Sequence, residues 1–369
     1  MKLEGVTVVD LSVFLPGPYL TMAMADHGAE VIKVEPPGEG DPGRHIGVAD
    51  GPSSVFFRNA NRGKKSVVLD LKSEAGRDAL YRLCDAADVF VESYRPGVMQ
   101  RLGFDWETLS ARNPRLVYCS ISAFGQDGPY RDLPAHDLAT EAYAGVLSLT
   151  HGRDGIPAMP GLAAADIISS LHALSGVAMA LFRRERTGRG DRIDVSMQHA
   201  ALAGLPNVLG TAMARQPQPD PKHERTTGGS AFYQVYDTAD GRHLVLGGQE
   251  LKFVRNLLGR LDRLDLVPLC ERGPGAHQAP VIEFLRGVFK RQTLAHWMAW
   301  FEGQDVSVAP VNTLREALDD PNLHAQGLIL TDDRGREHIA PVVRFTLEPA
   351  RPSLREPTLD EHHSVVGGN

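Results

Sequence analysis

This sequence contains few cysteines and no strong excess of positive or negative charge. The three cysteines, Cys84, Cys119 and Cys270, are scattered and form no CxxC pair. This spacing argues against a disulfide framework or a structural zinc site, and it favours thiols buried as small apolar side chains. The histidines show no metal-ligand spacing, and we expect His362 and His363 to be solvated in a polar tail. The formal net charge of -7 gives no uniform basic field for nucleic acid, so local basic residues have to hold any anionic ligand.

Long apolar segments are absent as well. Residues 1–20 contain Glu4, Asp10, Pro16 and Pro18, so they lack the basic start and the apolar core of a signal peptide. No apolar run approaches the roughly 18 residues that a membrane helix needs. We therefore expect a cytoplasmic protein without a membrane segment. Its 369 residues, 42% hydrophobic and 23% charged, are enough for about two globular domains of roughly 150 residues each.

The first half of the chain alternates apolar runs with helical stretches. The pattern predicts strands at 6–11, 31–35, 66–70, 88–92 and 115–121, and helices at 17–27, about 74–86 and 166–187. Such alternation predicts an α/β domain with a mostly parallel sheet that helices cover on both faces. No GxGxxG follows the first strand, no GxxxxGK[ST] occurs, and the formal match at 38–43 lies among prolines, so we interpret it as a loop.

A proline-rich segment separates this half from the next. Residues 216–221, Gln-Pro-Gln-Pro-Asp-Pro, cannot lie inside a sheet and indicate a linker. Beyond it the pattern predicts strands at 231–236 and 243–246, and helices near 250–261, 280–289 and 294–302. The second half is therefore a further α/β or α+β segment, and no internal repeat is visible.

A histidine and a carboxylate follow a glycine-rich turn at residues 123–137. His136 comes directly before Asp137, and Asp166 follows thirty residues after the histidine, among alanines and isoleucines. Histidine titrates near neutral pH, and a carboxylate in an apolar setting is costly unless it is paired or used. His136 and Asp166 are thus candidate proton carriers. A lone histidine is more often a surface or core residue, however, and Asp137 could equally close the turn or cap the next helix.

Short motifs along nearly the whole chain resemble those of family III CoA transferases. In order they are 10–17, 28–36, 69–72, 94–97, 125–129, 186–190 and 238–241. Each is weak alone, but the ordered combination is specific. The resemblance implies an α/β fold with a large Rossmann-like domain from both chain ends, a smaller middle α/β domain, and two subunits threaded into an interlocked homodimer. The expected parts are 1–200 for the first part of the large domain, 201–225 for a linker, 226–325 for the middle domain, and 326–369 for the return segment and tail.

Members of this family act on acyl-CoA thioesters by one of two chemistries. Transferases use an aspartate as a nucleophile that passes through a mixed anhydride to an enzyme-bound CoA thioester, and Asp166 matches that position. The family's alpha-methylacyl-CoA racemases keep this aspartate as a proton carrier and add a histidine and a glutamate, which His136 and Glu250 match. Transferases more often have an aromatic residue where His136 stands.

Racemisation explains why three such residues would occur together. Inverting a carbon next to a thioester needs a base on each face of a planar enolate, because one proton leaves and another arrives from the opposite side. On this interpretation Asp166 forms one side and His136 the other, with Glu250 orienting the imidazole. Backbone N–H groups near Asp137 would stabilise the enolate oxygen. Glu250 could instead be an exposed residue in the first turn of a helix.

The resemblance also implies a groove for coenzyme A, which would be part of the substrate and not a tightly bound cofactor. The residues expected to line it are Lys33, Val34, Leu69, Asp70, Leu71, Lys72, Ser93, Tyr94, Arg95, Pro96, Gly97, Arg101, Ala135 and Asp137. Val34 and Leu71 would contact the adenine. Lys72, Arg95 and Arg101 would bind the phosphates, although cations at loop ends are mostly solvated.

Two stretches depart from the racemase pattern. Residues 135–140, Ala-His-Asp-Leu-Ala-Thr, stand where racemases commonly have Gly-His-Asp-Ile-Asn-Tyr, and 167–171, Ile-Ile-Ser-Ser-Leu, stand where they have glycines. Both changes alter the bulk near the acyl pocket. We expect a racemase or epimerase of 2-methylacyl-CoA thioesters, with CoA transfer to a free carboxylic acid through Asp166 as the alternative. A CoA-binding scaffold without activity is the non-enzyme hypothesis.

Overall fold

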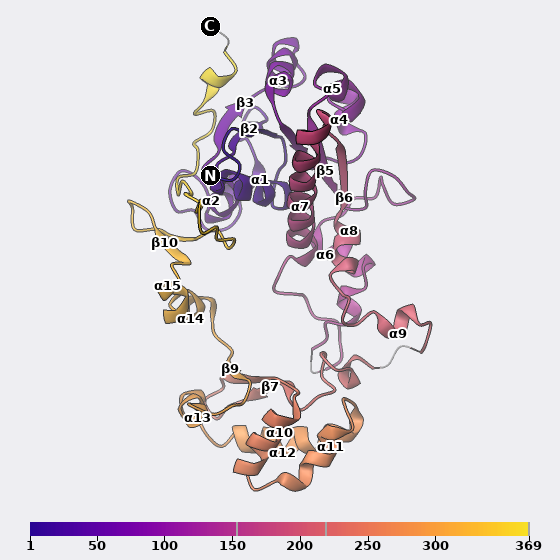
Figure 1. Cartoon of the computed structure of the whole chain (residues 1–369), viewed down its shortest axis with the longest axis vertical. Coiled ribbons are helices and arrows are strands. Elements are labelled where there is room, and N and C mark those ends of the chain that lie inside the picture. The colour runs from indigo at the N-terminus through magenta and orange to yellow at the C-terminus, as the bar shows by residue number, and fades with distance from the viewer. Residues whose placement is uncertain (153, 218–219, 368–369) are drawn as a thin grey trace. The chain divides into compact units, whose positions relative to one another are not determined.

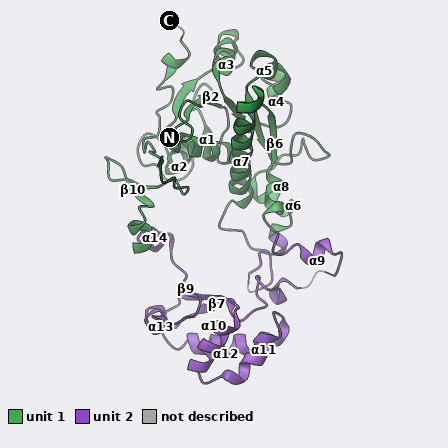
Figure 2. Cartoon of the chain, in the orientation of Figure 1, with its two compact units in different colours: residues 1–146, 159–204, 321–369 green, residues 147–158, 205–320 purple. Residues whose placement is uncertain are grey.

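The computed structural model describes residues 1–152, 154–217 and 220–367 (Figure 1). The chain forms two compact units (Figure 2). Unit 1 comprises residues 1–146, 159–204 and 321–369, and unit 2 comprises 147–158 and 205–320. Unit 1 thus takes residues from both ends of the chain. Residues 147–158 belong to unit 2 although they lie inside the range 1–200 expected for the large domain.

Unit 1 contains a six-stranded parallel sheet, which confirms the predicted α/β architecture. Its strands are β1 (Thr7–Asp10), β2 (Glu30–Glu35), β3 (Lys65–Val68), β4 (Val89–Glu92), β5 (Val117–Ser122) and β6 (Arg192–Ser196). The strand order is β3-β2-β1-β4-β5-β6, and all neighbours are parallel. The order reverses between β1 and β4, and ligands of such sheets bind at the carboxyl ends of the strands beside that point.

Helices cover both faces of this sheet. They are α1 (Pro16–Asp26), α2 (Val55–Asn61), α3 (Glu74–Ala86), α4 (Val98–Leu102), α5 (Trp106–Arg112), α6 (Asp137–Tyr143), α7 (Ala164–Thr187) and α8 (Met197–Ala203). Successive strand residues point to opposite faces. Val8 accordingly packs with α1 and α7 through Leu20 and Val177, whereas Val9 packs with α3 through Leu80.

Helix α7 corrects the expectation that no segment is long and apolar enough to cross a membrane. By length and composition alone, α7 could cross a membrane. Its most apolar 18 residues have a mean hydropathy of 1.5, and 28% of them are buried. Serines and His172 interrupt the apolar run in the sequence, but its many alanines and leucines keep the average high. A single such helix among the described residues is weak evidence, because core helices pass the same test.

The last part of unit 1 returns to the edge of the parallel sheet. It contains α15 (Pro321–Ala325) and an antiparallel pair, β10 (Ile329–Thr331) and β11 (Glu337–Ile339). Near the C-terminus, the backbone N–H of Ser66 in β3 donates to His362 Nδ1 at 3.2 Å, and the His362 N–H donates to the Ser66 carbonyl at 2.9 Å. His362 is therefore half-buried and bonded to β3, not fully solvated as expected, because a contact 296 residues apart in sequence leaves no local signal.

Unit 2 is an α+β unit with its own core. Its antiparallel sheet has the order β7-β8-β9, with β7 (Tyr233–Asp237), β8 (His243–Gly247) and β9 (Val308–Pro310). Its helices are α9 (Gly210–Met213), α10 (Leu251–Arg260), α11 (Val267–Glu271), α12 (Ala279–Phe289), α13 (Leu294–Phe301) and α14 (Leu314–Leu318). Tyr236, Leu257 and Phe289 are among the buried residues of its core. The predicted strands and the three predicted helices are confirmed; β9 was not predicted.

Candidate active site

A cavity of about 280 Å³ lies in unit 1, at the carboxyl ends of β1, β4 and β5. The side chains and backbone that line it come from six segments of unit 1. They are Val13, Phe14 and Pro16 after β1; Ser93, Tyr94, Arg95 and Pro96 after β4; Ile121, Ser122 and Ala123 at the end of β5; Arg131, Leu133, Ala135 and His136 before α6; Asp166 in α7; and Met197 at the start of α8. His136 and Asp166, thirty residues apart in sequence, therefore line one cavity.

Asp166 lies in the first turn of α7, where its carboxyl group is partly buried. Its backbone N–H donates to Asp137 Oδ1 at 3.0 Å. Burial raises the pKa of Asp166 to about 7, and the nearby carboxylates of Asp137 and Glu141 act in the same direction. A carboxyl group that titrates near neutral pH can both accept and release a proton under physiological conditions.

Two acidic side chains from α6 stabilise the start of α7. The residue before α7 is Ala163, which has no capping side chain. Instead Glu141 Oε1 accepts a hydrogen bond from the Ala164 N–H at 2.7 Å, alongside the bond from the Asp166 N–H to Asp137. Carboxylates at a helix N-terminus satisfy free N–H groups and favour the helix dipole. Asp137 thus caps α7, 29 residues on, and not the helix in which it lies.

Glu141 was not predicted as a site residue. It is fully buried, and its Oε2 receives no hydrogen bond within the described part of the chain. Burial raises the pKa of Glu141, and the neighbouring Asp137 raises it further. The sequence signal was its i, i+4 spacing from Asp137, which places both carboxyl groups on one face of α6.

His136 is the residue that immediately precedes α6, and its backbone is extended. Its side chain makes no capping hydrogen bond. The imidazole meets the ring of Phe14 edge to face, with ring centroids 5.9 Å apart and planes at 89°. The side chain is exposed and lines the cavity, which is the position that a proton carrier needs.

Glu250 lies in unit 2, where it directly precedes α10. Its side chain is exposed and makes no capping hydrogen bond. The cavity in unit 1 thus brings together two of the three predicted catalytic residues. A role for Glu250 beside His136 stays a prediction.

The positively charged part of the predicted CoA groove gathers around Gly97. This residue has a left-handed φ of 83°, and a Cβ atom there would lie 3.3 Å from Arg101 Nη1 and 3.8 Å from Arg131 Nη2. Arg95 and Arg131 line both the first cavity and a second one of about 230 Å³. Arg131 was not predicted, although it lies in the same loop as His136.

Other residues predicted for the groove differ in exposure. Asp70 and Lys72 are exposed in the turn after β3, and Leu71 is half-buried. Val34 and Leu69 are buried in the core.

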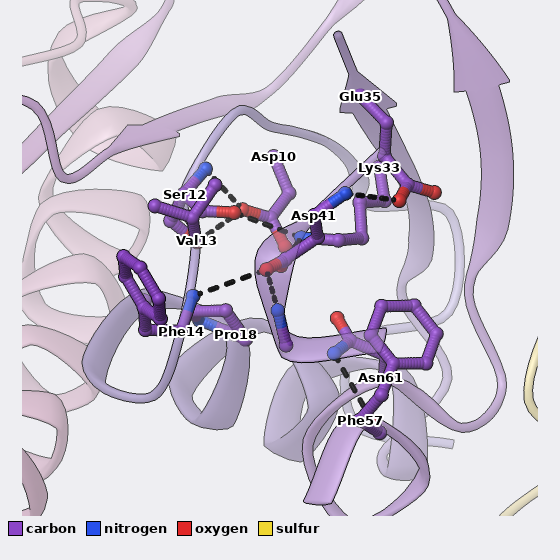
Figure 3. Close-up of polar contacts among 12 residues, drawn as sticks. Asp10, Ser12, Val13, Phe14, Pro18, Lys33, Glu35, Asp41, Phe57 and Asn61 are labelled. Atoms are coloured by element: carbon purple, nitrogen blue, oxygen red, sulfur yellow. Dashed lines mark hydrogen bonds and ion pairs between the residues drawn. The ribbon is translucent and has the colours of Figure 1, made fainter. Parts of the chain in front are cut away.

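Lys33 was predicted to contact the ligand, but its side chain is bonded to partners inside the protein. It is fully buried, and its Nζ donates to the Ser12 carbonyl at 2.8 Å and pairs with Asp41 Oδ2 at 2.8 Å (Figure 3). Burial would lower the pKa of Lys33, but Asp10 and Asp41 outweigh it and raise the pKa. The ammonium group is therefore charged and engaged inside the protein.

No group of three or more His, Cys, Asp or Glu side chains in the described residues is arranged to hold a metal ion. The three thiols are unpaired, and burial raises the pKa of each, in the case of Cys270 to about 11. The chemistry of the cavity thus rests on a histidine, a carboxyl group and arginines.

Comparisons with known proteins identify relatives along the whole chain. A model of CoA-transferase family III matches residues 3–363. The acetyl-CoA:oxalate CoA-transferase of Acetobacter aceti is 35% identical over 337 residues, covering 89% of this chain and 85% of that protein. The human alpha-methylacyl-CoA racemase is 35% identical over 374 residues, covering 99% and 92%. A CAIB/BAIF family protein from Brucella suis has a similar structure, with a TM-score of 0.86, 29% identity, and coverage of 99% and 98%.

Proposed function

The chain belongs to CoA-transferase family III, and from this premise we propose that it racemises or epimerises 2-methylacyl-CoA thioesters. Its relatives are CoA-transferases and acyl-CoA racemases, so it is an enzyme of one of these types. The observation that carries the choice is the cavity in which His136 faces the same space as Asp166, a carboxyl group with a pKa of about 7.

In this mechanism His136 and Asp166 exchange roles according to the configuration of the substrate. One group removes the proton from the carbon next to the thioester carbonyl, which leaves a planar enolate. The other group delivers a proton to the opposite face, and the carbonyl re-forms. An acid and a base whose pKa values lie near the working pH perform both directions efficiently. Backbone N–H groups near Asp137 would stabilise the enolate oxygen, and preorganised donors of this kind contribute roughly 3 kcal/mol each.

The CoA part of the substrate would bind through the arginines near the cavity. Arg95, Arg101 and Arg131 offer planar guanidinium groups that suit phosphate oxygens. The left-handed Gly97 lets the Arg101 guanidinium approach the backbone, because a Cβ there would lie 3.3 Å from Arg101 Nη1. The thioester end would then extend toward His136 and Asp166.

CoA transfer is the second candidate, and the position of Asp166 favours it. Asp166 lies in the first turn of the 24-residue helix α7, where its carboxyl group lines the cavity, and a carboxylate in that position can act as a nucleophile. It would attack the thioester carbonyl and release the CoA thiolate, giving a mixed anhydride. The thiolate would then attack the aspartyl carbonyl, releasing the free acid and leaving CoA on Asp166, from which an acceptor acid takes it by the reverse steps. Several relatives are named as transferases.

Solvent exchange tests the choice. The enzyme is incubated in deuterated water with a single epimer of a 2-methylacyl-CoA, and deuterium at the α carbon is followed by mass spectrometry together with the epimer ratio. We expect label and loss of configuration with the wild type. His136→Phe and Asp166→Asn should both lose epimerisation, and the variant that lacks the base facing the epimer used should also lose label. His324→Phe, an exposed histidine of α15, serves as the matched control. Absence of exchange, together with movement of CoA to a free acid that His136→Phe leaves intact, would overturn racemisation in favour of transfer.

A further inference from the structure

Phe14 has a backbone conformation that aromatic residues rarely adopt. Its φ is +64°, in the left-handed region. It lies in the loop between β1 and α1 and lines the cavity. A bulky residue in this region is strained, and it keeps such a conformation only where its surroundings hold it. Strain of this kind is found preferentially at functional sites.

Two buried charged side chains hold the backbone of this loop (Figure 3). Lys33 Nζ donates to the Ser12 carbonyl at 2.8 Å, and Asp41 Oδ1 accepts a hydrogen bond from the Phe14 N–H at 3.4 Å. Lys33 and Asp41 also pair with each other at 2.8 Å, with side chains that are 0% and 1% exposed. A buried ion pair is costly to break on one side only, so Lys33 and Asp41 form a fixed anchor against which the loop rests.

Further contacts fix the residues on the N-terminal side of Phe14. The Val13 N–H donates to Ser93 Oγ at 3.1 Å. The backbone N–H and the hydroxyl of Ser12 both donate to Asp10 Oδ1, the former at 2.9 Å. The loop is thus held from β1, from β2 and the loop after it, and from the loop after β4.

The side chain that this loop presents meets the proposed proton carrier. The Phe14 ring lies edge to face with the His136 imidazole, with centroids 5.9 Å apart. His136 makes no capping hydrogen bond with its side chain. The ring contact therefore restricts how the imidazole can turn on this side.

We propose that Phe14 is a positioning residue for His136, and that the buried Lys33–Asp41 pair keeps it in place by holding its backbone in the left-handed conformation. The inference rests on the proposed function only in assigning His136 to proton transfer. Catalytic groups have to be held within a fraction of an ångström, because small displacements of reacting atoms lower the rate steeply. Lys33 and Asp41 act through the loop and do not touch the reacting atoms.

The substitutions Phe14→Gly and Phe14→Ala separate backbone from ring. Both variants remove the ring, so we expect the kcat of solvent exchange to fall about 10- to 100-fold in both, with a much smaller change in KM. Glycine adopts a positive φ without strain and alanine only at a cost, so the Phe14→Gly protein should unfold at a higher temperature than the Phe14→Ala protein. At most positions an alanine variant is more stable than a glycine variant, so the expected order is the reverse of the usual one. Unchanged kcat in both variants, or a Phe14→Ala protein that is more stable than Phe14→Gly, would overturn the proposal.

Histidine NMR on the resting protein tests positioning without any turnover. With ¹⁵N-labelled histidine, the His136 signals are assigned by their loss in His136→Phe. We expect one dominant tautomer in the wild type and averaged tautomers in Phe14→Gly. Asp41→Asn should show the same averaging with the Phe14 ring still present, while His324 signals stay unchanged. Identical His136 signals in all three proteins would refute positioning. Because no substrate is needed, this result stands whether or not the enzyme is a racemase.

Discussion

At the scale of single residues, two carboxyl groups at the ends of neighbouring strands have pKa values that are shifted in opposite directions. Burial would raise the pKa of Asp10, but Lys64 and Lys33 outweigh it and lower the pKa to about 2. In the adjacent strand, burial raises the pKa of Glu92 to about 7, and hydrogen bonds from the Ser120 hydroxyl and the Tyr94 N–H do not offset it. Contact with a buried cation therefore decides which of these carboxyl groups is charged.

Glu92→Gln should stabilise the protein above neutral pH. Folded Glu92 keeps its proton up to about pH 7, whereas the unfolded chain releases it near pH 4.5. Between these values the folded state binds more protons, so the contribution of Glu92 to stability falls as pH rises through this window. The loss amounts to roughly 3 kcal/mol at most. Gln carries no titrating proton, so the variant does not lose this stability as the pH rises.

Urea unfolding of both proteins at pH 5 and pH 8 measures this effect. The free energy of unfolding of Glu92→Gln relative to the wild type should be higher at pH 8 than at pH 5 by about 1 to 3 kcal/mol. Comparing the two proteins at each pH cancels the titration of every other group. A difference that is the same at both pH values would contradict the raised pKa of Glu92.

Asp137→Asn should shift the pH dependence of solvent exchange. The amide oxygen of the new side chain can still accept the hydrogen bond from the Asp166 N–H, so the geometry of α7 is retained. Removing a like charge makes the Asp166 carboxylate easier to form, which lowers the pKa of Asp166 from about 7. The limb of the rate–pH profile that Asp166 controls should move to lower pH. Asp78→Asn, at an exposed residue of α3, should leave the profile in place.

At the scale of elements, the turn between α7 and β6 shows how two glycines in one short segment differ. Gly188 follows α7 with a φ of +68°, and apart from its neighbours along the chain no heavy atom of the described residues lies within 4 Å of the position a Cβ would take. Gly190 donates its N–H to the Pro114 carbonyl, and a Cβ there would lie 1.8 Å from the Leu116 carbonyl oxygen. Gly188 is needed for its conformation, and Gly190 for the close approach of two backbones.

Gly190→Ala should therefore destabilise the protein more than Gly188→Ala. At Gly188 the added methyl group meets only the strain of a positive φ, about 1 to 2 kcal/mol. At Gly190 it meets backbone, which cannot rotate away as a side chain can, so the cost should exceed about 3 kcal/mol. Thermal unfolding of the two variants provides the comparison. Equal losses of stability would show that the backbones can separate without cost at Gly190.

Local patterns predicted the elements that carry the site, but not the contacts that assemble it. The strands β1 to β5 and the helix α7 follow from apolar runs between glycines and prolines, and the structure confirms them. Asp137 was interpreted as a residue that closes a turn or caps its own helix. Its carboxylate instead accepts a hydrogen bond from the N–H of Asp166, 29 residues away. Glu141 and β9 were missed for the same reason, since their partners are distant in sequence.

At the scale of the whole molecule, the described chain leaves a long apolar helix face uncovered. Met179 and Phe182 of α7 are 66% and 62% exposed, and Leu171 is 49% exposed. Exposed apolar side chains grouped on one helix mark an interaction surface more often than a solvated one. This face supports the proposal that a second copy of the chain packs on it in a homodimer.

Met179→Glu tests the homodimer directly. If α7 packs against a second copy, the new carboxylate would have to be buried there without a partner, which costs several kcal/mol. A cost of about 4 kcal/mol corresponds to roughly a thousandfold weaker dimer.

Leu314→Glu makes the same change at a residue of unit 2 that is 87% exposed, and should leave the mass of the dimer unaltered. Analytical ultracentrifugation at micromolar concentration should give twice the 40.1 kDa chain mass for the wild type and for Leu314→Glu, and the chain mass for Met179→Glu. A wild-type protein that sediments as a monomer would rule the homodimer out, whereas a Met179→Glu protein that remains dimeric would place the interface on another face.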